Sequence, residues 1–128
     1  MRSMLLVLLG GAVAVAPLSS HHSFAAHYFE EQSLTITGDL VQFDYRSPHA
    51  WVHVMAPDEN GTMRRYAAEW SNPNRLVQQG ITKDTLRAGD RVVIVGSPGR
   101  TAGEYKIHLK GIERPADGWK WRGARNRR

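Results

Sequence analysis

Two adjacent histidines directly follow a segment that has the layout of an export signal. His21 and His22 come after Ser20, so a signal peptidase that cuts there would leave His21 as the first residue of the mature chain. A free α-amine and the imidazole of the same residue form a chelate, and near-planar nitrogen ligands suit Cu(II) better than Ni(II) or Zn(II). These ligands must be deprotonated, so we expect metal affinity to fall as the pH falls. The alternative interpretation is that both histidines are the polar start of the mature chain and bind no metal.

The first twenty residues contain the three parts of a secretory signal. A positively charged start (1–3) precedes an apolar stretch (4–18) and two small residues. About 15 apolar residues are too few to span a bilayer comfortably, so we expect cleavage, after Ser20 rather than after Ala16, which a proline follows. The sequence therefore predicts a signal peptide at 1–20 and a periplasmic or secreted product with no transmembrane segment.

A third histidine and a carboxylate extend the candidate metal site. His49 follows Pro48 at the start of a predicted strand. It is either a distant ligand that joins His21 or a hydrogen-bonding group that fixes the turn. Glu69 ends the next predicted strand and would either orient a ligating histidine or pair with a surface arginine. His53 shares a strand face with His49 but lies about 13 Å away, too far for one metal ion to bridge both.

Two tryptophans suggest a different kind of site. Trp51 and Trp70, with Tyr45 and Tyr66, would form an aromatic face of the kind that stacks sugars or bases in small barrels. Large aromatics more often pack a core. The sequence thus leaves open a metal-free module that binds a glycan, a peptide or an envelope partner through Trp51 and Trp70.

Composition narrows the class of protein. The chain has no cysteine, which excludes disulfides, thiolate metal sites and cysteine nucleophiles. Its net charge of +5 is carried by residues 114–128, because residues 21–113 have 10 basic against 11 acidic side chains. A nucleic-acid-binding module needs its basic surface on the fold, so we expect no nucleic acid as a binding partner.

Residues 114–128 are expected to be a disordered basic tail or to touch anionic lipid. The sequence has no catalytic motif, so we expect no enzyme.

The hydrophobic pattern predicts a small, mostly β domain over residues 21–113. Alternating and β-branched runs predict strands at 33–45, 49–56, 62–70, 91–96 and 104–113. A bend or bulge is expected at Gly38, and the alternation changes phase by Val41. Asn72 caps a short helix that begins at Pro73. The order β-β-β-α-β-β is that of a five-stranded OB-like barrel; an open β-sandwich or roll is the alternative.

Several short blocks of sequence together resemble a known family. The blocks are His21-His22-Ser23-Phe24-Ala25-Ala26, Leu34-x-x-x-Gly38, Ser47-Pro48-His49-Ala50-Trp51, Glu69 ahead of Pro73-x-x-Leu76, and Leu86-x-x-Gly89-Asp90-x-Val92. In this order they are similar to the uncharacterised small exported bacterial proteins called domain of unknown function 6152, over residues 21–113. The resemblance implies export and a small β fold, and it implies no activity. His27 and His53 depart from the acidic and aromatic residues that the resemblance implies there, so neither is given a family role.

Overall fold

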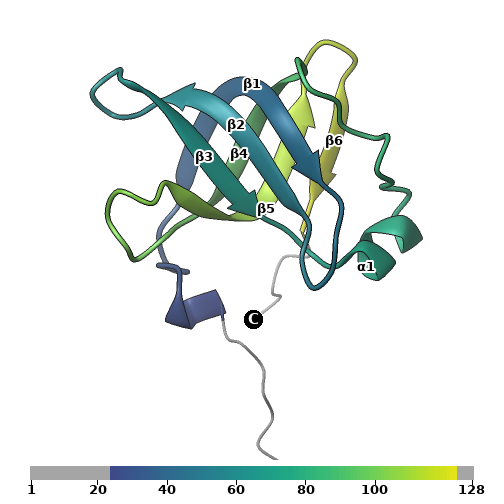
Figure 1. Cartoon of the computed structure of the whole chain (residues 1–128), viewed down its shortest axis with the longest axis horizontal. Coiled ribbons are helices and arrows are strands. Elements are labelled where there is room, and N and C mark those ends of the chain that lie inside the picture. Colours follow the sequence, from purple (N-terminus) through teal and green to yellow (C-terminus); the bar gives the residue numbers. More distant parts are fainter. Residues whose placement is uncertain (1–23, 124–128) are drawn as a thin grey trace, which may run out of the picture.

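A computed structural model describes residues 24–123 of the chain. The signal peptide predicted at 1–20, with His21 and His22, lies outside the described residues. The strands are β1 (Leu34–Asp44), β2 (Trp51–Pro57), β3 (Met63–Glu69), β4 (Arg91–Pro98), β5 (Lys106–Arg114) and β6 (Trp119–Arg122). A single 3-10 turn, η1 (Phe24–Ala26), precedes β1, and the helix α1 (Pro73–Gln78) lies between β3 and β4. Figure 1 shows η1 and α1 at the lower end of the strands.

The sheet closes on itself because β3 pairs with β5. The strand order is β3-β2-β1-β4-β5-β6, with β3–β5 as an additional pairing. That pairing is parallel, whereas the other neighbouring strands are antiparallel. The result is a closed, mixed, five-stranded barrel with one extra strand. The predicted OB-like barrel is confirmed, and the open sandwich is not formed.

β1 reaches two neighbours because it changes register in its middle. Its first half pairs with β4 and its second half with β2. The register with β2 shifts between Leu40 and Gln42, where the sequence changes its phase of alternation. Gly38 serves a different purpose. A Cβ at this position would lie 2.1 Å from the carbonyl oxygen of Met55, so β1 and β2 approach this closely only with glycine there.

The barrel interior is filled by alternate residues of the strands and by the helix. Buried side chains of β2 are Val52, Val54 and Ala56, as the period of two requires. α1 contributes Leu76 to the same cluster, and the side chain of Asn72 accepts from the backbone N–H of Arg75 at 2.9 Å as the predicted N-cap. Over residues 24–123, no helix has the length and apolar character needed to cross a membrane.

The prediction of a disordered tail is wrong for residues 114–123. β6 pairs with β5 from Gly111 opposite Arg122 to Arg114 opposite Trp119. Trp121 packs on Trp70 with ring centroids 5.1 Å apart. The charges of this segment dominate its composition, but its alternate tryptophans supply the apolar side that holds a strand in place. Residues 124–128 lie outside the described part of the chain.

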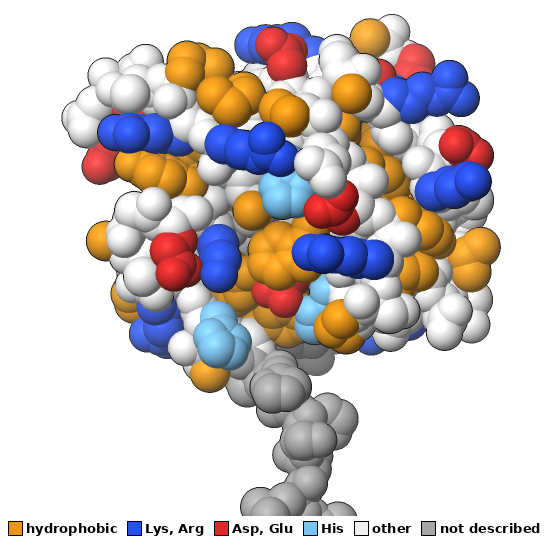
Figure 2. Space-filling model, viewed as in Figure 1, with side chains coloured by type: hydrophobic (Ala, Val, Ile, Leu, Met, Phe, Trp, Pro, Cys, Tyr) orange, Lys and Arg blue, Asp and Glu red, His pale blue; other side chains and the backbone are white. Residues whose placement is uncertain are grey.

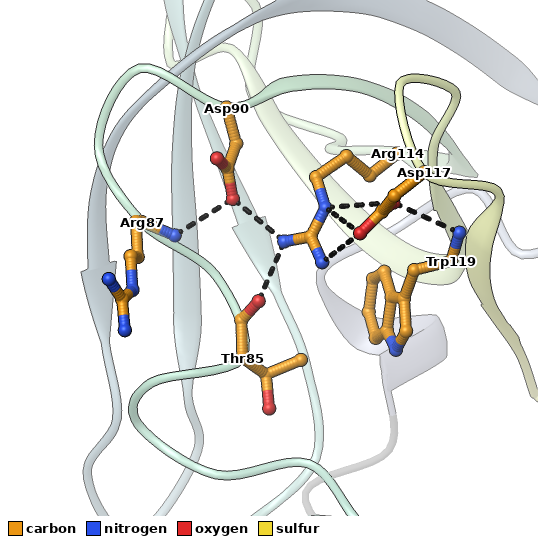
Figure 3. A network of polar contacts seen from close by, with 6 residues as sticks. All are labelled: Thr85, Arg87, Asp90, Arg114, Asp117 and Trp119. Carbon is orange, nitrogen blue, oxygen red and sulfur yellow. Dashed lines mark hydrogen bonds and ion pairs between the residues drawn. The ribbon is translucent and has the colours of Figure 1, made fainter.

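Arg114 fixes the turn between β5 and β6 to the loop before β4. Figure 3 shows its guanidinium between Asp90 and Asp117. It donates to Asp90 Oδ2 at 2.9 Å, to Asp117 Oδ2 at 2.8 Å and to the carbonyl oxygen of Thr85 at 2.8 Å. The bonds to Asp117 and, against the effect of burial, to Asp90 raise the pKa of Arg114. This network explains why the segment after β5 is ordered.

Candidate functional site

Barrel closure brings two histidines to one end of the molecule. His49 comes just before β2, Glu69 ends β3, and His108 lies within β5. Across the ladders, Glu69 is the partner of Trp51 on one side and of His108 on the other. Residues far apart in the sequence therefore surround one carboxylate.

The carboxylate of Glu69 has two hydrogen-bond partners, an imidazole and a phenol. Its Oε1 lies 2.9 Å from Nδ1 of His49, and its Oε2 accepts from the hydroxyl of Tyr28 at 2.6 Å. Burial and then the bond to Glu69 raise the pKa of Tyr28 far above its usual value, so this hydroxyl stays a donor. A carboxylate beside Nδ1 favours the tautomer of His49 that carries its proton there, which leaves the Nε2 lone pair for a ligand. The sequence left two partners open for Glu69, a histidine or a surface arginine, and in the structure Glu69 contacts His49.

His108 has the same arrangement with a different carboxylate. Its Nδ1 lies 2.6 Å from Glu30 Oε1. Nζ of Lys110 lies 3.0 Å from Glu30 Oε2 and donates to the Glu30 carbonyl oxygen at 3.0 Å. Burial raises the pKa of Glu30, but the hydrogen bonds from His108 and Lys110 outweigh this effect and lower the pKa overall. Glu30 is therefore an anion at neutral pH.

The ring of Phe24 lies between the two imidazoles. It stacks on His108 with centroids 3.7 Å apart and an interplanar angle of 0°, and on His49 at 5.4 Å and 29°. Tyr28 contacts the same cluster, 6.0 Å from Phe24 and 5.6 Å from His108 between centroids. The first described residue is thus held beside both histidines.

Backbone hydrogen bonds fix this segment to the connection between β4 and β5. The N–H of Phe29 donates to the carbonyl of Pro98 at 2.9 Å, and the N–H of Arg100 donates to the carbonyl of His27 at 2.9 Å. Tyr28 forms an isolated bridge with Gly99. These bonds place the side chains of the segment over the end of the barrel.

A cavity of about 530 Å³ opens beside the histidines. Phe24, His49 and His108 line it together with Trp70 and Trp121. On the molecular face in Figure 2, basic side chains are spread among acidic and hydrophobic ones rather than gathered in one patch. At the barrel end, two imidazoles thus line a cavity with room for a small ligand.

The described residues do not form a complete metal site. Within 24–123, no three histidine, aspartate or glutamate side chains are grouped so that they could hold a metal ion. His53 contacts Asp44 Oδ2 through its Nε2 at 3.1 Å and does not line the large cavity. The described residues alone therefore supply too few ligands to hold a metal ion at His49.

Trp51 and Trp70 do not share a face, so the predicted aromatic platform is wrong. Trp70 is 2% exposed and belongs to the core, as does Tyr66. Trp51 is half-buried and lines a separate cavity of about 250 Å³ with Tyr28 and Glu69. The pleat explains the separation, because Trp51 is opposite Glu69 and Trp70 is the next residue along.

Three residues of the cluster were not predicted from the sequence. Tyr28 and Glu30 precede the first strand and belong to no periodic pattern. His108 is one of several alternate polar positions of β5. Only the pairing of β3 with β5 relates His108 to Glu69, and strand order alone does not reveal which strands close a barrel.

Known proteins resemble this chain in sequence and in structure. The profile of the family described as "Family of unknown function (DUF6152)" matches residues 9–107. Among solved structures, the chain is similar to the mitochondrial single-stranded DNA binding protein Rim1 from S. cerevisiae. The two are 15% identical with a TM-score of 0.45, over 73% of this chain and 97% of that chain. No curated protein matches the sequence.

Proposed function

The chain belongs to the family of unknown function DUF6152. Because the family description names no activity, we propose a function from the histidines at the barrel end. The protein is an exported, non-enzymatic module that binds Cu(II). Its metal site combines the mature amino terminus with an imidazole of the barrel.

His49 carries the proposal among the described residues. Its Nδ1 faces Glu69 at 2.9 Å, and its imidazole lines the large cavity. Histidines that ligate metals commonly have a carboxylate on the other ring nitrogen, which orients the ring and increases its basicity. This arrangement supports a metal ligand more than a turn-fixing group, which would need no open cavity.

The position of Phe24 supports the participation of the amino terminus. Its ring lies 5.4 Å from that of His49, and it comes three residues after His21. Three residues span at most about 10 Å, which is long enough for the proposed site to combine the amine and imidazole of His21 with His49. His22 is a further nitrogen donor in the same segment.

The donor types favour copper in its oxidised state. The chain has no cysteine, so soft thiolates that select Cu(I) are missing, whereas amine and imidazole nitrogens in a tetragonal set suit Cu(II). Such a site belongs in an oxidising compartment, and the proposal places the protein in the periplasm or outside the cell. The metal-free alternative has less support, because Trp70 is buried and only Trp51 of the pair reaches the surface.

Copper titration of the exported protein tests the role of the amine. Intact mass first establishes that the chain begins at His21. A variant with one alanine inserted before His21 keeps every side chain but removes the chelate of amine and imidazole. We expect the natural protein to bind one Cu(II), and the extended variant to bind about tenfold more weakly or worse, because one chelating donor is lost. Equal binding by both proteins, or no binding by either, would overturn the proposal.

A further inference from the structure

We propose that the large cavity binds a small aromatic carboxylic acid as its anion, and that Arg75 and the indole N–H of Trp70 donate hydrogen bonds to its carboxylate. This inference goes beyond the proposed function and does not rest on it, because neither donor is a histidine and no metal ion takes part.

The cavity has the size and the walls of a site for a small molecule. Its volume of about 530 Å³ falls within the range of about 300–1,000 Å³ that is usual for ligand sites. The rings of Phe24, Trp70 and Trp121 line it, and aromatic rings pack well against another flat ring. A ligand with one or two fused rings therefore matches these walls.

The side chains with a formal charge on the cavity wall are arginines. Arg75 of α1 and Arg122 of β6 line the cavity, and no aspartate or glutamate of the described residues does so. Figure 1 shows α1 and β6 on the same side of the barrel. The wall therefore favours a ligand that carries a negative charge.

Arg75 is the cation that we assign to the ligand. Over residues 24–123 its side chain takes part in no ion pair, so its guanidinium has both N–H pairs of its fork left for a carboxylate. Arg122 is less suitable, because its Nη1 lies only 3.3 Å from where a Cβ on Gly111 would be, and it also lines a separate small cavity.

Trp70 contributes a donor that has no partner in the described fold. It is 2% exposed, and its Nε1 is buried without a hydrogen bond. An unpaired buried donor costs stability, and most buried polar side-chain atoms in proteins do have a partner. Because Trp70 lines the cavity, a ligand there would bring the missing acceptor.

Trp121 is the neighbour that must shift for an acceptor to reach this nitrogen. Its ring packs edge-to-face on Trp70, and it lies on β6, a strand of four residues at the end of the strand order. The competing explanation is that the N–H of Trp70 points to the face of the Trp121 ring, as a weak hydrogen bond that needs no ligand.

Two carboxylates near the cavity oppose an anion, but both are already bonded. Glu30 faces His108 and Lys110, and Glu69 accepts from Tyr28 and faces an imidazole. Both lie behind the histidines, so we assign the ligand's carboxylate to the side of the cavity that α1 forms.

Titration of the exported protein with 2-naphthoate in the presence of a metal chelator tests the site. The neutral 2-naphthamide is the matched ligand, because it has the same rings without the charge. We expect naphthoate to bind about tenfold more tightly or better, since hydrogen bonds to an ionised acceptor are the stronger ones. No binding of naphthoate, or equal affinity for both compounds, would overturn the inference. The chelator removes copper, so this result and the copper titration can fail independently.

Substitution of Arg75 tests its role. Arg75→Gln should weaken naphthoate binding by about three- to tenfold, as expected for a charged hydrogen bond at a partly exposed site, and should leave naphthamide binding unchanged. Arg87→Gln is the matched control, because Arg87 is also exposed and does not line the cavity. Equal effects of the two substitutions on naphthoate binding would contradict the assignment.

Nuclear magnetic resonance of the unmodified sequence reports on Trp70 directly and requires no variant to fold. Each of the four tryptophans gives one indole N–H resonance, and sequential assignment identifies them. The Trp70 resonance should move downfield as naphthoate is added, because an N–H that gains a carboxylate acceptor is deshielded, whereas the Trp119 resonance should stay in place. A Trp70 resonance that does not move while naphthoate binds would show that the N–H faces the Trp121 ring, and the inference would fail.

Discussion

At the level of single residues, the two carboxylates at the barrel end, Glu30 and Glu69, differ in their hydrogen-bonding and charged partners. Glu69 accepts from a neutral phenol and an imidazole, whereas Glu30 faces the cation of Lys110 as well as His108. The folded state thus stabilises the anion of Glu30, which is why the pKa of Glu30 is lowered although burial opposes this. A shifted pKa in the folded state makes stability depend on pH.

Glu30→Gln should therefore destabilise the protein at neutral pH, and this destabilisation should disappear in acid. The pKa of Glu30 is lower in the folded than in the unfolded state, so its stabilisation is complete above the unfolded value and disappears as the pH falls through the folded value. We expect the free energy of unfolding to fall by about 1 kcal/mol at pH 7. A fully buried hydrogen bond to a charged group would contribute more, but Glu30 is partly exposed. Urea unfolding at about pH 7 and about pH 3 measures it, with Glu31→Gln, the exposed neighbour, as the control. A loss of equal size at both pH values would contradict the prediction.

At the level of elements, local signals in the sequence were sufficient for most of the barrel. The phase change at Val41 predicted the register shift of β1, and Asn72 with Pro73 predicted the start of α1. Local signals failed where an element is held by distant partners. β6 is ordered by Trp70 and by the Arg114 network, and the segment before β1 is held by the β4–β5 connection. Half of the candidate site belongs to that segment, which explains why His49 and Glu69 were found and Glu30 was not.

Two glycines lie where neighbouring strands approach each other closely, and their substitution tests this close packing. A Cβ at Gly96 would lie 2.1 Å from the carbonyl oxygen of His108, and one at Gly38 equally close to that of Met55. Both obstacles are backbone atoms of the neighbouring strand, so neither can move without separating the pair. We expect Gly38→Ala and Gly96→Ala each to cost about 3 kcal/mol or more, or to prevent folding. Thermal unfolding and soluble yield report this.

Gly61 supplies the control for these substitutions. It has a positive φ of 79°, and a Cβ added there would meet no other heavy atom within 4 Å, so only backbone conformation matters at this position. Gly61→Asn should cost about 1 kcal/mol or less, because asparagine tolerates the left-handed region. Native-like melting of Gly96→Ala would show that β4 and β5 have room for a Cβ between Gly96 and His108.

For the whole molecule, one edge of β5 is divided between two partners. Residues 106–108 pair with β3, and residues 111–114 pair with β6. β3 thus closes the barrel over only part of this edge, and β6 covers the part that remains. An uncovered strand edge would be open to pairing with other chains. The hairpin after β5 therefore completes the barrel, and its Trp121 also covers Trp70 and lines the cavity at the candidate site.

Trp121→Ala should weaken the whole barrel and not only its last strand. Trp121 packs edge-to-face on the buried Trp70 at 5.1 Å, and its Nε1 donates to the side chain of Gln79, just after α1. Removing this ring exposes Trp70 to water and breaks the link to α1, so we expect a loss of about 2–3 kcal/mol in the free energy of unfolding. Lys120→Ala, an exposed change on the same strand, should cost less than about 0.5 kcal/mol. Urea unfolding monitored by circular dichroism compares the two variants. If they unfold at the same urea concentration, β6 is an appendage of the barrel and the closure of β5 depends on β3 alone.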